Sequence, residues 1–131
     1  MLSAQLQESL PAENSSKGAA GLHITHILKR DETLKPFNAE KITQAIVKAM
    51  TAEGEGNQAD AEAITSQVVQ ALVAIKRTDS RYTPSIEAIQ NIVEDKLMAS
   101  DFPSVAKAYI LYRQRQAEKR KLNIFEKRAI L

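Results

Sequence analysis

The sequence predicts an α+β fold in which a small cap of three short strands accompanies a bundle of four helices. β-branched and apolar residues flank a polar turn between residues 24 and 37, which is typical of a hairpin. After residue 38, apolar residues recur every three or four positions in separate segments, which is the period of amphipathic helices. A chain of 131 residues with 44% hydrophobic residues is long enough for one domain with one core.

The hairpin is predicted from two short runs of strand-forming residues. Residues 31–33 form the polar turn, and residues 34–37 form the return strand. Pro36 cannot donate a hydrogen bond to a neighbouring strand, so the return strand should lie at a sheet edge. The first run contains the strand formers Ile24, Thr25, Ile27 and Leu28.

The first helix is predicted over residues 39–52, and the residues around its start could bind an anion. Asn38 is a good N-cap because its side-chain oxygen can accept from free N–H groups of the first turn. Lys29 and Arg30 end the first strand, and Lys41 stands in the first helical turn, where the helix dipole disfavours a cation. These cations and the helix N–H groups could surround a phosphate chain, or they could form a solvated surface. Neighbouring residues of an ideal strand point to opposite faces, so Lys29 and Arg30 share a pocket only if the strand twists or ends there.

The remaining elements follow from breaks in the helical pattern. The glycines at 54 and 56 close the first helix, and a second helix is predicted over residues 59–76. Residues 82–83 are expected to add the third strand. Thr83 is the expected cap of a third helix over residues 84–99, with Pro84 at its first position.

The fourth helix is expected to be capped by Asp101 and to carry Pro103 in its first turn. It would bury Tyr109 and Tyr112, which could stack on a base but are expected to seal the bundle. From residue 113 onward the pattern becomes polar and basic. Seven basic residues stand against two acidic ones between residues 113 and 128, so any affinity for nucleic acid would belong to this tail rather than to the body.

The domain boundaries follow from composition. Residues 1–21 lack a sustained apolar period and are expected to form a flexible leader, although three leucines are spaced like one helical stripe. Residues 22–116 would form the folded domain. Residues 117–131 are expected to form a basic and apolar tail, or a linker to a further domain.

Several chemistries find little support in the composition. The chain has no cysteine, which excludes disulfides and thiolate zinc sites and fits a reducing compartment. His23 and His26 would face opposite sides of a strand, so no metal site is expected. With no other histidine and no carboxylate pair in an evident apolar pocket, an enzyme is the least supported class. The absence of a membrane-length apolar run and of a signal peptide predicts a cytoplasmic protein.

Four sequence motifs resemble a known family, the ATP-cone, which occurs in ribonucleotide reductase subunits and in a related transcriptional repressor. They occur in the family's order and cover roughly residues 22 to 116. The motifs are Ile27-Leu-Lys-Arg-Asp31, Pro36-Phe-Asn-Ala-Glu-Lys-Ile42, Tyr82-Thr-Pro-Ser-Ile86 before a helix with Ile92-Val-Glu94, and Val105-Ala-Lys-Ala-Tyr-Ile-Leu-Tyr-Arg113.

The resemblance implies a β-cap over a helical bundle that binds ATP or dATP with Mg²⁺, without catalysing a reaction. Such a domain switches the activity or oligomeric state of the reductase subunit to which it belongs. The implied partners are therefore an adenine nucleotide, ribonucleotide reductase subunits and further copies of the chain in a nucleotide-dependent oligomer. A membrane or nucleic acid is not expected.

The resemblance also implies roles for individual residues. Lys29 and Arg30 would contact phosphates, and Ile27 would line the adenine side. The remaining implied nucleotide contacts are Asn38 and Lys41 at the phosphate and sugar end, Thr83 and Glu87 near the base, and Arg115 as a weaker match.

Two positions depart from the family pattern. Glu32 stands where a glycine is usual, so the turn is expected to be longer or differently shaped. Glu87 stands where some members have histidine, and it could pair with the adenine amino group or signal a different nucleotide stoichiometry.

The leading hypothesis is therefore an allosteric nucleotide-binding domain of a ribonucleotide reductase. An alternative is a helical module that binds protein or nucleic acid through its basic tail, with binding that falls steeply with salt. A further alternative is a degenerate cone that kept the fold and lost the ligand, for which Glu32 and Glu87 are the residues to suspect.

Overall fold

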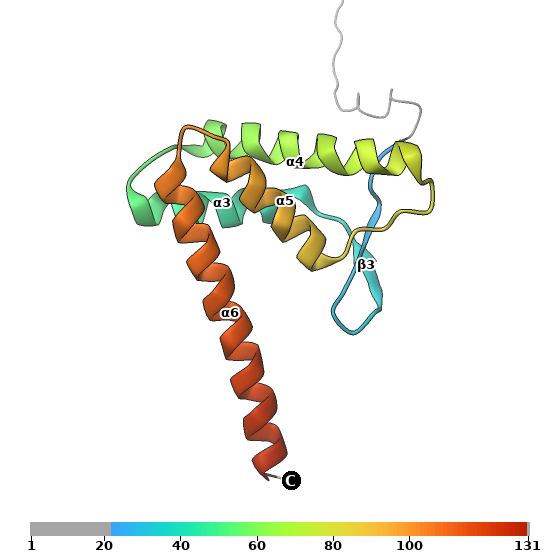
Figure 1. Ribbon diagram of the computed structural model, residues 1–131, viewed down its shortest axis with the longest axis vertical. Helices are drawn as coiled ribbons and strands as arrows, with labels where there is room; N and C mark the ends of the chain where they lie inside the picture. Colours follow the sequence, from blue (N-terminus) through green and yellow to red (C-terminus); the bar gives the residue numbers. More distant parts are fainter. Residues whose placement is uncertain (1–21, 131) are drawn as a thin grey trace, which may run out of the picture. The chain divides into compact units, whose positions relative to one another are not determined.

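A computed structural model describes residues 22–130 (Figure 1). The chain divides into two units. The leader expected for residues 1–21 and the terminal Leu131 lie outside the described residues. One unit comprises residues 22–37 and 68–89, and the other comprises residues 38–67 and 90–130. The described elements are β2 (His26–Leu28), β3 (Leu34–Pro36), α3 (Ala39–Glu53), α4 (Gln58–Thr78), α5 (Ile86–Met98) and α6 (Pro103–Ile130). The α+β class and the four helices are thus confirmed.

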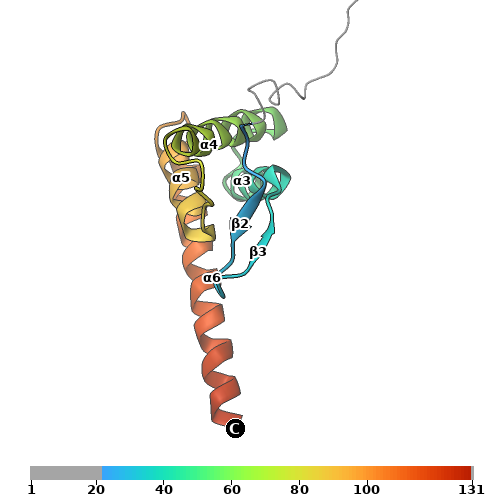
Figure 2. The same ribbon diagram turned by 90° about the vertical axis from the view of Figure 1, so that its right-hand side faces the viewer.

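The hairpin of the first unit is antiparallel, with Ile27 opposite Lys35 (Figure 2). Its turn is closed by two backbone hydrogen bonds, from Lys29 N–H to the Thr33 carbonyl (2.7 Å) and from Glu32 N–H to the Lys29 carbonyl (2.9 Å). Glu32 has φ of 68°, the left-handed conformation in which this turn usually places glycine. The turn is therefore not longer than usual, because Glu32 itself adopts the glycine conformation.

The prediction that residues 82–83 add a third strand is wrong, because only a single bridge forms beside the hairpin. Leu28 N–H donates to the Pro84 carbonyl at 2.9 Å, and Leu28 and Ser85 form a single parallel bridge. The pairing cannot continue, because Pro84 has no N–H and the chain turns into α5 at Ile86. The described part of the chain therefore contains a two-stranded sheet with one bridge beside it.

Two helix starts also differ from the expected ones. Ser85, rather than Thr83, caps α5, because its hydroxyl oxygen accepts from Ala88 N–H at 3.0 Å. Phe102, rather than Asp101, precedes α6, because its carbonyl accepts from the N–H groups of Val105 and Ala106 at 3.1 Å each. At α5 a neighbouring hydroxyl residue replaces the expected cap, whereas at α6 the first turn is bonded to a backbone carbonyl and not to a side chain.

In the second unit, α3 has the expected caps. The Asn38 side chain accepts from Glu40 N–H at 3.0 Å, and Gly54 ends the helix with φ of 67°. Gly56 has φ of 80°, and a Cβ there would lie 2.5 Å from the Met50 sulfur, so a side chain cannot fit without a shift. The two glycines therefore terminate α3 for structural reasons.

The core of the second unit is mostly apolar, with one buried polar pair. The Thr43 and Thr65 hydroxyls lie 2.8 Å apart, and Thr65 donates onward to the Ala61 carbonyl at 2.9 Å. Thr43 also lies 3.5 Å from the Ala39 carbonyl, so each buried hydroxyl has a partner whichever of the two donates to the other. The buried apolar residues of this unit are Ile42, Ile46, Ala49, Met50, Ala61, Ile64, Val93, Leu97, Val105, Ala106 and Tyr109.

The basic segment after residue 113 belongs to the same helix as the core residues of α6. This helix runs without a break from Pro103 to Ile130, and Leu122 and Ile124 on it are exposed (Figure 1). Among the residues described here, none of the helices is long and apolar enough to span a bilayer.

We predict that replacing Glu32 with glycine stabilises the protein. A non-glycine residue pays a steric cost in the left-handed region, partly offset by the greater freedom of glycine in the unfolded chain, so we expect a gain of about 0.5–1 kcal/mol. Denaturant unfolding measures it. Glu32→Ala is the matched control, because it removes the same carboxylate and keeps the Cβ. An equal gain in both variants would contradict the assignment to backbone strain.

Candidate functional site

Five of the implied site residues belong to the first unit, and among them the structure shows direct side-chain contact between Arg30 and Glu87. Strand β2 ends at Leu28 and a turn follows. The side chains of Lys29 and Arg30 therefore need not point to opposite faces, and both residues are exposed. Thr83 is exposed in the extended segment before α5, and Glu87 lies in the first turn of that helix. Ile27 is only 8% exposed and belongs to the core, so its side chain leaves little surface for a ligand.

The central contact of this site is an ion pair between Arg30 and Glu87. Arg30 Nε lies 2.7 Å from a carboxylate oxygen of Glu87, with side chains that are 35% and 49% exposed. A carboxylate in the first turn of a helix is also favoured by the helix dipole. The Arg30 guanidinium is thus held beside the N-terminus of α5, and a carboxylate of the chain already occupies this position.

The hairpin turn next to Arg30 is fixed by Asp31. Its carboxylate accepts from the Thr33 hydroxyl (2.6 Å) and from Thr33 N–H (3.1 Å). These hydrogen bonds, with a smaller contribution from the charge of Lys29, lower the pKa of Asp31 below its ordinary value. Asp31 therefore stays ionised at neutral pH and keeps the turn that presents Lys29 and Arg30 in one shape.

The other implied residues, Asn38, Lys41 and Arg115, belong to the second unit. The side-chain oxygen of Asn38 is engaged in capping α3, and Lys41 is exposed in the first turn of that helix. Arg115 is exposed on α6.

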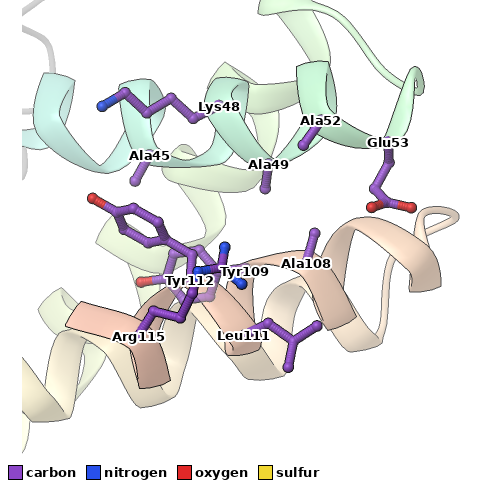
Figure 3. A pocket seen from close by; sticks show the side chains of 10 residues that line it. All are labelled: Ala45, Lys48, Ala49, Ala52, Glu53, Ala108, Tyr109, Leu111, Tyr112 and Arg115. Carbon is purple, nitrogen blue, oxygen red and sulfur yellow. The ribbon is translucent and has the colours of Figure 1, made fainter. Parts of the chain in front are cut away.

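Arg115 lines a groove of about 210 Å³ between α3 and α6 (Figure 3). Tyr109 is 5% exposed and seals the unit as expected, whereas Tyr112 is 38% exposed and faces the groove. Sequence reasoning missed Lys48, which lies on the α3 side of this groove. Its position seven residues after Lys41 was the available signal, since two helical turns bring such residues to one side. The full lining is Ala45, Lys48, Ala49, Ala52, Glu53, Ala108, Tyr109, Leu111, Tyr112 and Arg115.

A second ion pair lies near Tyr109. Arg113 donates to the Glu94 carboxylate, and both side chains are only about a fifth exposed. Burial raises the pKa of Tyr109 to about 12, with the Arg113 charge opposing this rise and the Glu94 charge adding to it.

We predict that Tyr109 ionises at a higher pH than an ordinary tyrosine. Its pKa in the folded protein, about 12, exceeds the ordinary value of 10.0, so its contribution to stability is complete below pH 10 and is lost as the pH rises through 12. Absorbance titration of the phenols should show a late component that Tyr109→Phe removes. Tyr112→Phe is the control and should leave that component in place. A late component that survives Tyr109→Phe would contradict the assignment.

Comparison with known proteins identifies the family to which the chain belongs. The family model of the ATP cone domain matches residues 25–118, and the chain belongs to this family. Within that range the structure describes a hairpin with four helices, and no group of three histidine, aspartate or glutamate side chains that could hold a metal ion lies among the described residues.

Proteins similar to the chain include several ribonucleotide reductases. The chain is 43% identical over 98 residues to a vitamin B12-dependent ribonucleoside-diphosphate reductase of Thermoplasma acidophilum, covering 71% of the chain and 12% of that protein. It is 37% identical over 88 residues to an anaerobic ribonucleoside-triphosphate reductase of Salmonella typhimurium, covering 67% and 12%. A ribonucleoside-diphosphate reductase subunit alpha of Chlamydia pneumoniae is 33% identical over 101 residues, covering 74% and 10%. The chain thus spans about an eighth or less of these relatives.

Proposed function

We propose that this chain is an allosteric domain that binds ATP or dATP and controls the activity or oligomeric state of a ribonucleotide reductase subunit. The observation that carries the proposal is the position of the Arg30 guanidinium beside the first turn of α5, with Lys29 on the same exposed turn. Membership in the ATP-cone family supports the ligand class, and the reductase relatives support the kind of protein that is controlled.

The phosphates are the part of the nucleotide that this turn is suited to bind. Lys29 supplies a mobile point charge, Arg30 supplies a planar fork of donors, and the N-terminus of α5 adds positive partial charge. Mg²⁺ would accompany the phosphates, because this ion commonly keeps several waters and binds through nucleotide phosphates rather than through a dedicated protein cage. Thr83 is exposed on the segment that leads into α5 and is our candidate for the base end.

Control requires that the nucleotide bind two arrangements of the reductase with different affinity, since equal affinity would shift nothing. ATP and dATP differ only at the ribose 2′-position, so discrimination must begin with contacts to the sugar. We propose Asn38 and Lys41 for the contacts to the sugar from the family resemblance alone. The cytoplasmic location is likewise a prediction.

Calorimetric titration with ATP and dATP, each with Mg²⁺, tests the proposal. We predict that Lys29→Ala weakens binding by about ten- to a hundredfold, as loss of a charge-assisted contact to phosphate would. Because the Lys29 side chain is exposed, the melting temperature should hardly change. Lys41→Ala should also weaken binding.

Lys107→Ala is the control, because Lys107 is an exposed lysine of α6 outside the proposed site. It should bind nucleotide as the unaltered chain does. Unchanged affinity in both Lys29→Ala and Lys41→Ala would reject the phosphate assignment, and absence of binding by the unaltered chain would reject the proposed function. The mass of the protein, followed in parallel, tests control of the oligomeric state.

A further inference from the structure

We propose that Glu87 is a competitor built into the nucleotide site: in the nucleotide-free chain its carboxylate occupies the place of a phosphate on Arg30, and nucleotide must displace it. This inference rests on the proposed function, because it assumes that Arg30 binds the phosphates. It deepens that function by naming the residue that limits nucleotide affinity.

The backbone places the two side chains together. Leu28 and Ser85 form a parallel bridge, and Leu28 N–H is bonded to the Pro84 carbonyl at 2.9 Å. Arg30 and Glu87 each lie two residues beyond this bridge. Their meeting, with 2.7 Å between Arg30 Nε and a Glu87 oxygen, is therefore set by the register of the bridge.

Glu87 satisfies the same two electrostatic features that attract a phosphate. It neutralises the guanidinium, and it stands in the first turn of α5, where the helix dipole favours an anion. A phosphate group that approaches Arg30 meets this carboxylate, and two anions on one guanidinium repel each other at contact distance. The nucleotide must therefore break the pair before it gains the full contact with Arg30.

The exposure of the pair makes displacement feasible. Arg30 and Glu87 are 35% and 49% exposed, so water can solvate the released carboxylate, and such pairs contribute little to stability. The Arg113–Glu94 pair is different, because its side chains are only 21% and 22% exposed. The chain thus offers a second, more buried ion pair outside the proposed site as a control.

The test compares Glu87→Gln with Glu94→Gln in titrations of the 131-residue chain with MgATP. Glutamine keeps the size of the side chain and removes the charge. We expect Glu87→Gln to bind MgATP about two- to tenfold more tightly than the unaltered chain, the range set by loss of an exposed ion pair and of its repulsion toward phosphate. Glu94→Gln should leave affinity unchanged, with a melting curve checking that each variant is folded. Added salt should narrow the difference made by Glu87→Gln, because it screens exposed charges.

A double-mutant cycle separates competition from a general change of charge. In an Arg30→Ala background, Glu87→Gln should lose most of its effect, since the competitor no longer has its target. An equal gain with and without Arg30 would overturn the proposal. Unchanged affinity of Glu87→Gln would also overturn it. Weaker binding of Glu87→Gln would overturn it too, because it would mean that Glu87 contacts the nucleotide directly. If neither the unaltered chain nor Glu87→Gln binds MgATP, the proposed function fails as well. Normal binding with no response to Glu87→Gln rejects only the competition.

Discussion

The hydrogen bond from Leu28 to Pro84, with its bridge at Ser85, is the constraint on which the proposed site depends. It fastens the end of β2 to the residues that open α5. Because Pro84 supplies a carbonyl and no amide, the contact is restricted to a single point, and the chain is free to enter the helix at once. The hairpin turn and the helix N-terminus are consequently neighbours, and Arg30 is held where an anion is also attracted by the dipole of α5.

Local signals predicted most of the fold. Asn38 and Gly54 marked the ends of α3 because capping depends on a few adjacent residues, and apolar spacing located the other helices. The errors came where neighbouring residues compete for one role. Thr83 and Ser85 both suit a cap, and the bridge at Ser85 favoured the second. Glu32 stands at a turn position that usually requires glycine, yet the turn is not longer. Two backbone hydrogen bonds hold the hairpin and can impose an unfavourable φ on Glu32.

The site residues remain predictions, and the structure shows one side-chain contact among them, the Arg30–Glu87 ion pair. The types and order of Lys29 and Arg30 predicted a phosphate-binding role. The partner of Arg30 is Glu87, which lies 57 positions away, and no local sequence pattern specifies such a pair. Ile27, expected to line the adenine side, is mostly buried, and strand alternation alone does not say which face of a strand becomes the core. The groove beside Tyr112 and Arg115 likewise depends on how α3 and α6 pack.

Hydrogen exchange of the chain with and without MgATP tests the central claim most directly, because it reports where a ligand acts as well as whether it binds. The account predicts slower exchange at the turn, residues 29–33, and at the segment entering α5, residues 83–88. Amides beside the groove at Tyr112 should change little. Protection confined to the groove, or no change anywhere in the presence of saturating nucleotide, would contradict the assignment of the phosphate site to the hairpin turn and the N-terminus of α5.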